Sequence, residues 1–283
     1  MNKLTAILCR FSVIALLLAI GTGVQLTGPR RAEATIPLPA SVDNQMKLSG
    51  LTEQYGDMLD DVAAGLELQR DYFSMLSDED FSSMAEQVVA IFQPDEILRG
   101  IRNEIARSLS DEDVARLIAW YQSDIGRKIT DLEVQASTQE SHRKMMAMKE
   151  LQLSKTQRVA FARRFDELLK LSHFAMEYYK IQQEAMVIAL NGLLTSDELI
   201  DTEEYHRQVE LYEDEIREQT EEMITVSIVF TYRWLSDGEL EEYMQFNQQD
   251  YALKLSQAVF RGAVSAMRRM LEQMAQAGAA TRQ

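Results

Sequence analysis

The residues best suited to metal chemistry in this sequence are its histidines and the acids near them. The three histidines are His142, His173 and His206, and Glu203 lies three positions before the last of them. Helical bundles present a carboxylate and an imidazole to a metal ion with this spacing, but they combine two such pairs with two further carboxylates. Neither of the other two histidines follows an acid at that spacing. We therefore predict no metal site and no cofactor.

Other catalytic signatures are also missing from the sequence. It contains no glycine-rich phosphate loop, no Gly-x-Ser-x-Gly and no His-Glu-x-x-His. The single cysteine, Cys9, lies near the N-terminus, so residues 35–283 hold no thiol nucleophile and no disulfide. The acidic runs are typical of solvated helix faces. A helical hydrolase or metal-dependent enzyme, using acids near residues 123–126 or around His206, is the alternative hypothesis rather than the leading one.

The N-terminal segment has the pattern of a secretory signal. Lys3 and Arg10 precede an uncharged apolar run, and Ala32-Glu33-Ala34 fits a small-x-small cleavage site. We predict export to the periplasm or cell envelope, with residues 1–34 removed after Ala34. The alternative is an uncleaved N-terminal anchor, which would make the protein a membrane-tethered structural subunit.

The charge of the chain restricts its partners. The net charge is −16, and removal of residues 1–34, which hold four basic residues and one acid, makes it −19. Nucleic acid requires a basic footprint, and anionic lipid attracts basic segments. We therefore expect no nucleic-acid binding and no strong binding to anionic membranes.

Helix-start signals divide the rest of the chain. Ser77, Ser110 and Thr195 each precede an acid by three positions, as in a capping box. Pro94 suits the first position of a helix. After it, apolar residues recur every four positions, which predicts one buried helix face. These residues are Ile97, Ile101, Ile105 and Leu109.

Three further segments give specific expectations. Residues 35–44 contain two prolines and no helical period, so we expect a linker there. From Ile125 the apolar pattern predicts one long helix that ends near Glu150. The apolar run from Met223 to Trp234 is rich in β-branched residues, but we predict a buried helix because no partner strand is apparent.

The segment 109–129 resembles a second segment, 235–255, at an offset of 126 residues. Six positions are identical, and Trp120 aligns with Phe246. Tyr121, Ser123 and Gly126 have no counterpart in the second segment. The pattern predicts an all-α fold of two tandem helical modules, bundle-like with antiparallel helices, after the signal peptide. The modules are expected at 45–150 and 154–276, followed by a flexible tail at 277–283.

The run from Ser110 through Trp120-Tyr121-x-Ser123-x-x-Gly126-x-Lys128 resembles the signature of an uncharacterised bacterial exported helical domain family. Its members often carry proline where this chain has Asp124. The resemblance extends over residues 45–150 and implies an all-α exported protein without an established activity.

These residues also have a physical interpretation. Ser123 can cap a new helix, and Gly126 leaves room for a close helix approach. A kink covered by aromatic side chains is the favoured interpretation, with a ligand or peptide groove beside it as the alternative. We name Trp120, Tyr121, Ser123, Gly126 and Lys128 as candidate binding residues, and a protein or peptide as the candidate partner.

Overall fold

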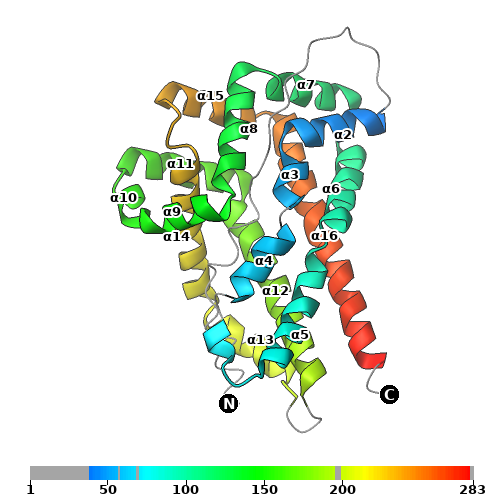
Figure 1. The fold of residues 1–283 in the computed structure, drawn as a ribbon. Coiled ribbons are helices and arrows are strands. Elements are labelled where there is room, and N and C mark those ends of the chain that lie inside the picture. The colour runs from blue at the N-terminus through cyan, green and yellow to red at the C-terminus, as the bar shows by residue number, and fades with distance from the viewer. Residues whose placement is uncertain (1–37, 57, 68–69, 195–198, 281–283) are drawn as a thin grey trace.

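The computed structural model is all-α and describes residues 38–280 except 57, 68–69 and 195–198 (Figure 1). No strand occurs among these residues, and none of their helices is long and apolar enough to cross a membrane. The predicted signal peptide and the Thr195 start signal lie outside the described residues. The first elements are α2 (Leu38–Leu48), α3 (Leu51–Gly56), α4 (Met58–Glu67), η2 (Arg70–Phe73), α5 (Asp78–Val89), η3 (Ala90–Phe92), α6 (Pro94–Ser108), α7 (Asp111–Tyr121) and α8 (Asp124–Ala136). They are followed by α9 (Gln139–Ala147), α10 (Lys149–Leu153), α11 (Thr156–Leu169), α12 (Leu171–Leu193), α13 (Thr202–Leu211), α14 (Glu213–Thr231), α15 (Asp237–Asn247) and α16 (Asp250–Ala280).

The starts of α5, α6 and α7 follow the predicted sequence signals. The Ser77 hydroxyl accepts a hydrogen bond from the Asp80 amide at the start of α5. Ser110 and Asp113 form the predicted capping box of α7, and Pro94 occupies the first turn of α6. All four residues of the apolar stripe are buried, which confirms the predicted face (Ile97, Ile101, Ile105 and Leu109). Local hydrogen-bonding chemistry therefore sets these boundaries.

Two predicted segment boundaries are wrong. Residues 38–44, expected in the linker at 35–44, form the first turns of α2, because Pro39 falls in the first turn, where proline is tolerated. Residues 277–280, expected in the flexible tail at 277–283, continue α16. Helices α2 and α16 therefore extend further than predicted.

The long helix predicted from Ile125 to about Glu150 is also wrong, since α8, α9 and α10 are separate. The Ser137 hydroxyl donates to the carbonyl of Val134, and the Thr138 hydroxyl accepts from the Ser141 amide as the cap of α9. Hydroxyl side chains that bond to nearby backbone compete with helix continuation. The predicted buried helix at Met223–Trp234 is confirmed up to Thr231, the end of α14.

Helices α6 and α16 cross at very short range. A Cβ atom added to Gly262 would lie 2.5 Å from Cα of Ile101, and one added to Gly100 would lie 2.6 Å from the Gly262 carbonyl oxygen. Two glycines thus let the helix backbones touch, with Ile101 and Ala266 buried beside the crossing. One hydrophobic core extends from α2 to α16, so residues of both predicted modules pack in the same interior.

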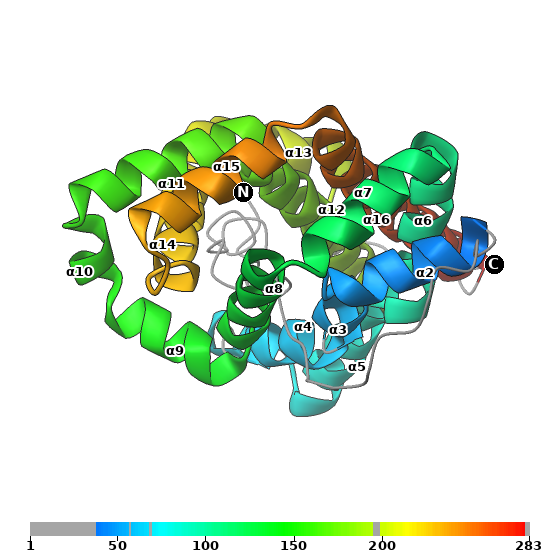
Figure 2. The ribbon, with the colours of Figure 1, turned by 90° about the horizontal axis from the view of Figure 1, so that it is seen from above.

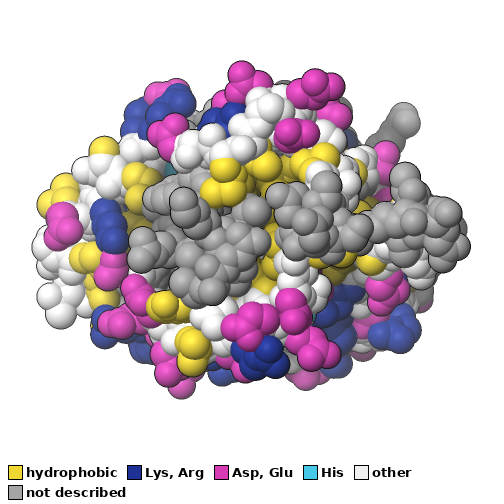
Figure 3. All heavy atoms as spheres, turned by 90° about the horizontal axis from the view of Figure 1, so that it is seen from below, with side chains coloured by type: hydrophobic (Ala, Val, Ile, Leu, Met, Phe, Trp, Pro, Cys, Tyr) yellow, Lys and Arg dark blue, Asp and Glu magenta, His cyan; other side chains and the backbone are white. Residues whose placement is uncertain are grey.

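Viewed from above, α9, α10 and α11 lie at one end of the molecule and α2 and α6 at the other (Figure 2). Helices α7, α8 and α15 lie between these ends. On the opposite face, acidic and basic side chains lie along the edge, and hydrophobic ones lie nearer the middle (Figure 3). The candidate site is built where α7, α8 and α15, which are distant in sequence, contact one another.

Candidate functional site

The corner between α7 and α8 is built by Ser123 and Gly126. The Ser123 hydroxyl donates to the Trp120 carbonyl at 2.6 Å and accepts from the Gly126 amide at 3.0 Å. A Cβ atom on Gly126 would lie 2.0 Å from the Trp120 carbonyl oxygen, far inside any real contact. The predicted cap is confirmed, and the close approach at Gly126 is to the end of α7. Both residues therefore hold the corner itself.

The aromatic side chains at the end of α7 pack on α15. The ring of Trp120 lies on that of Phe246, with centroids 4.1 Å apart and planes 4° from parallel. Tyr121 meets Phe246 edge-on at 6.1 Å. Both side chains of the dipeptide are half-buried. Stacked and edge-on pairs are the favoured geometries of aromatic rings, so Phe246 joins the two segments that align in the sequence.

Lys128 joins the same two segments by charge. Its Nζ lies 2.5 Å from Oε1 of Glu239, in the first turn of α15. A second ion pair joins a lysine of the second segment to an acid of the first. Nζ of Lys254, in α16, lies 3.7 Å from Oδ2 of Asp113, in the first turn of α7. In the alignment at an offset of 126, Lys254 matches Lys128 and Glu239 matches Asp113. The two ion pairs are therefore reciprocal, because each joins the lysine of one segment to the acid of the other.

Glu133 of α8 is a half-buried carboxyl group beside these aromatic rings. Its Oε1 accepts hydrogen bonds from the hydroxyl of Tyr232 at 2.6 Å and from that of Tyr243 at 2.7 Å. No described residue donates to Oε2, and no described cation forms an ion pair with Glu133. Among the described residues, Oε1 thus accepts two hydrogen bonds and Oε2 accepts none, so Oε2 can accept a hydrogen bond from a ligand.

The ionisation of these groups follows from their burial. Burial raises the pKa of Glu133, and the two tyrosine hydrogen bonds offset the rise only in part. Burial also raises the pKa of Tyr232 and Tyr243 well above the ordinary value, and the nearby Glu133 adds to the rise. The pKa of Tyr121 is raised for the same two reasons. Tyr232 and Tyr243 therefore donate their hydrogen bonds to Glu133 as neutral phenols.

A cavity of about 180 Å³ opens beside Glu133 and Tyr121. Its walls come from α2–α3, α7, α8, α11–α12 and α15–α16. Most of the lining side chains are apolar or aromatic, and Glu133 supplies the only carboxyl group among them. The aromatic and carboxyl side chains of the lining are Tyr55, Tyr121, Glu133, Phe174, Phe246 and Phe260.

The predicted site residues divide between this cavity and its frame. Tyr121 lines the cavity, whereas Trp120 supports it through Phe246. Ser123, Gly126 and Lys128 do not line it and hold the corner and the contact with α15. Sequence reasoning missed Glu133. The available signal was its position four residues after Ile129, where a carboxyl group replaces an apolar residue on the inward face.

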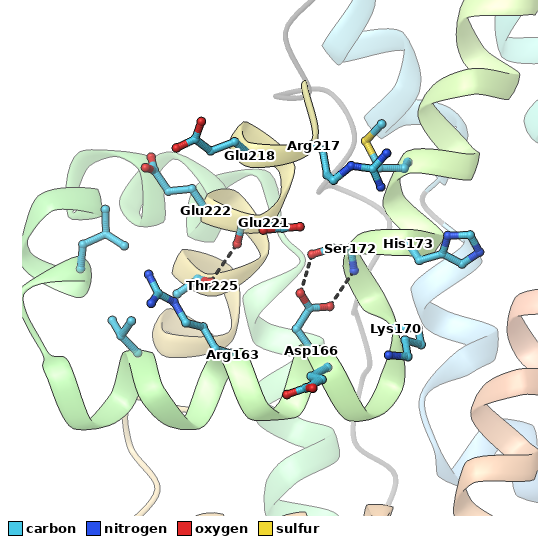
Figure 4. Close-up of a pocket in the computed structure, with 14 residues that line it drawn as sticks. Arg163, Asp166, Lys170, Ser172, His173, Arg217, Glu218, Glu221, Glu222 and Thr225 are labelled. Carbon is cyan, nitrogen blue, oxygen red and sulfur yellow. Dashed lines mark hydrogen bonds between the residues drawn. The ribbon is translucent and has the colours of Figure 1, made fainter. Parts of the chain in front are cut away.

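A larger hollow of about 780 Å³ lies between α11, α12 and α14 (Figure 4). Some of its charged side chains are bonded within the fold. Asp166 accepts from the Ser172 amide at 2.7 Å and from its hydroxyl at 2.5 Å, which caps α12. Arg217 pairs with Glu213 at 2.9 Å. Most of the side chains that line this hollow are charged, whereas the smaller cavity has mainly apolar and aromatic walls and a single carboxyl group.

Glu203 and His206 do not line the cavity beside Glu133. They lie on α13, where both side chains are exposed. No group of three or more histidines, cysteines, aspartates or glutamates with metal-site geometry occurs among the described residues. The side chains near His206 include Lys180, Glu210 and Glu213, which line a separate hollow of about 240 Å³.

Comparison with known proteins gives one match. Residues 95–152, from the first turn of α6 to α10, match the family described as "Uncharacterized protein conserved in bacteria (DUF2059)". No curated protein and no solved structure matches the chain. The matched residues include the whole signature from Ser110 to Lys128. The chain therefore carries a DUF2059 domain, a bacterial domain of unknown function, at residues 95–152.

Proposed function

We propose that this chain is an exported binding protein of the cell envelope, which receives one side chain of a protein or peptide partner in the cavity beside Tyr121. The observation that carries the proposal is the cavity itself, which has largely apolar and aromatic walls and a single, half-buried carboxyl group. Apolar walls with few placed polar groups are the usual composition of binding pockets.

The size of the cavity selects the kind of occupant. Pockets for drug-sized ligands measure about 300–1,000 Å³. An apolar cavity of about 150 Å³ holds one benzene molecule. At about 180 Å³ the cavity therefore matches one large side chain rather than a cofactor or a whole metabolite.

The position of the cavity supports a binding role for the paired modules. In the proposal, segments 109–129 and 235–255 belong to two copies of one module that pair about an approximate two-fold axis. In an isologous pair, each contact between residue i and residue j has its mirror contact. The reciprocal ion pairs Lys128–Glu239 and Lys254–Asp113 are such contacts. Glu133 comes from the first copy and Phe246 from the second, so neither copy encloses the cavity alone.

Export is the second element of the proposal. Its support is the predicted leader at residues 1–34 and the strongly acidic composition of the rest. An acidic chain of this kind attracts basic partners over a long range and repels acidic surfaces. The partner is therefore expected to be a protein or peptide with basic residues.

The direct test is selection of peptides from a random library on purified residues 35–283. Ser256 lines the cavity on α16, and Gln257 beside it is exposed. Ser256→Phe fills the cavity with a ring, and Gln257→Phe adds the same ring outside it. We expect enriched peptides to bind the parent protein and Gln257→Phe equally, and to lose at least tenfold in affinity for Ser256→Phe.

Equal binding to Ser256→Phe and Gln257→Phe would contradict the proposal, because the peptides would then use another surface. Circular dichroism and the unfolding midpoint of both variants show whether the helical fold is kept. If Ser256→Phe does not fold, Ala252→Leu fills part of the same cavity with a smaller change and gives the same comparison.

A further inference from the structure

We propose that the group bound in the cavity is an alkylammonium ion, presented as a lysine side chain of the partner. The inference rests on the proposed function and specifies its ligand. Two features of the cavity carry it, namely the carboxyl group of Glu133, which forms no ion pair with any described residue, and the aromatic side chains that line the same cavity.

The first feature is the environment of Glu133. Its Oε1 already accepts two phenol hydrogen bonds, while no described residue donates to Oε2. A carboxylate removed from water is costly unless a cation and hydrogen bonds compensate for it. The described residues supply hydrogen bonds to Glu133 but no cation. A positively charged ligand would complete the arrangement.

The second feature is aromatic. Phe174 and Phe260 pack edge to face at 5.1 Å, and Tyr121 and Phe246 do the same at 6.1 Å. Aromatic faces attract cations, and rings around an ammonium group form the usual cage for such ligands. Five rings line this one cavity, a density that an apolar ligand would not require. They are Tyr55, Tyr121, Phe174, Phe246 and Phe260.

The geometry favours lysine over arginine. Guanidinium groups bind best in a bidentate manner, with two parallel hydrogen bonds to both oxygens of a carboxylate. Here Oε1 of Glu133 is already bonded by Tyr232 and Tyr243, so one oxygen is left. An ammonium group is compact and needs only one carboxylate oxygen, while its methylene stem fits the apolar walls.

The same arrangement predicts how binding depends on pH. A cation binds the ionised form of Glu133, and burial raises the pKa of this carboxyl group in the free protein. The titratable neighbours are Tyr55, Tyr121, Tyr232 and Tyr243, and burial raises the pKa of each. They stay neutral between pH 5 and 8. Affinity for the cation is therefore expected to rise with pH as Glu133 loses its proton.

The experiment compares three probes by NMR titration of the protein labelled at tyrosine rings. The probes are Ac-Ala-Ala-Lys-Ala-Ala-NH2, the same peptide with norleucine in place of lysine, and n-butylammonium chloride. Norleucine keeps the apolar stem and removes the charge. We expect the lysine peptide to bind at least tenfold more tightly than the norleucine peptide at pH 7.5, and more weakly at pH 5.

Glu133→Gln is the matched variant, because its amide oxygen can still accept from both tyrosines. It is expected to bind the lysine and norleucine peptides equally. An arginine peptide is expected to bind more weakly than the lysine peptide.

Each contrary outcome has a distinct meaning. Equal affinity of the parent protein for the lysine and norleucine peptides would overturn the cation inference and leave the proposed function standing. Binding of n-butylammonium as tight as that of the lysine peptide would overturn the peptide source. Undiminished peptide binding by Ser256→Phe would overturn the proposed function itself.

Discussion

Trp120 and Phe246 lie face to face, 4.1 Å apart, although they are separated by 126 residues and occupy the same position in two aligned segments. Their contact places the end of α7 against α15 and sets Tyr121 at the wall of the cavity. The position and shape of the cavity therefore depend on this pair. Its energetic contribution can be measured directly.

Removal of either ring is expected to destabilise the fold. Truncation of a buried aromatic residue to alanine costs about 3–5 kcal/mol, and Trp120→Ala should fall at the lower end because Trp120 is half-buried. A double-mutant cycle of Trp120→Ala and Phe246→Ala should give a coupling of about 1 kcal/mol, the value for stacked pairs. Urea unfolding measures both quantities. Trp234→Ala, at a residue 69% exposed, is the control and should change stability by less than about 0.5 kcal/mol. Strict additivity would show that the stacking contributes nothing.

Gly126→Ala is expected to destabilise the corner between α7 and α8. The new Cβ atom would lie 2.0 Å from the Trp120 carbonyl oxygen, so the backbone must shift. Overpacking of this kind costs about 1–3 kcal/mol. Gly238→Ala is the matched control, since nothing lies within 4 Å of its added Cβ and alanine favours the helix. Thermal unfolding should show a fall for the first variant and no fall for the second; equal midpoints would contradict this account of Gly126.

Local features of the fold could be predicted from the sequence, and contacts across the chain could not. Ser77, Ser110 and Pro94 mark helix starts because their caps use neighbouring backbone groups only. The break between α8 and α9 was not predicted. It depends on the hydrogen bond from the Ser137 hydroxyl to the Val134 carbonyl, and the polar sequence around Ser137 is equally compatible with a continuous helix.

The candidate site shows the same limit. Tyr121 was identified from its segment, whereas Glu133 acquires its meaning from Tyr232 and Tyr243, which lie 99 and 110 residues further along the chain. Only the packing of α8 against α14 and α15 brings these groups together. The spacing of Glu133 from Ile129 could have indicated an inward position, but it gives no indication of the partners of Glu133.

Glu133→Gln is expected to change how stability depends on pH. The pKa of Glu133 is raised in the folded state, so its stabilising contribution is complete below the ordinary pKa of 4.5 and is lost as pH rises through the folded pKa. The parent protein should therefore lose stability relative to Glu133→Gln as pH rises from 4.5 toward neutrality. Denaturant unfolding across this range measures the difference. Asp131→Asn, exposed on the same helix, should follow the parent. A variant less stable than the parent by more than about 1 kcal/mol at pH 7 would contradict burial of the carboxyl group.

Glu239 is expected to make stability depend on pH in the opposite direction, with a loss of stability as pH falls. Its ion pair with Lys128 and its bonds to Ser236 lower its pKa to about 2. Its stabilisation is therefore present above pH 4.5 and is lost as pH falls toward 2. Its side chain is 28% exposed, so solvent screening limits the effect to about 1 kcal/mol. Glu239→Gln should remove this acid-dependent loss, and Glu242→Gln, exposed on the same helix, should keep it. An unchanged acid profile in Glu239→Gln would show that the pair does not form in solution.

Export predicts the N-terminus of the protein recovered from cells. Sequencing of protein from the periplasmic fraction should start at Thr35, because the cleavage pattern ends at Ala34. Substitution of Ala32 and Ala34 by bulky residues should block processing and shift the mass by that of the retained leader. Recovery of residues 1–34 on the unmodified protein in membranes would instead favour the anchored alternative.

The most direct test of the central claim is a crystal structure of residues 35–283 bound to a peptide selected on them. The account predicts one side chain of the peptide inside the cavity, between the rings of Tyr121 and Phe246, with its end group at Oε2 of Glu133. A peptide bound elsewhere, for example in the groove between α11 and α14 with the cavity unchanged, would contradict it.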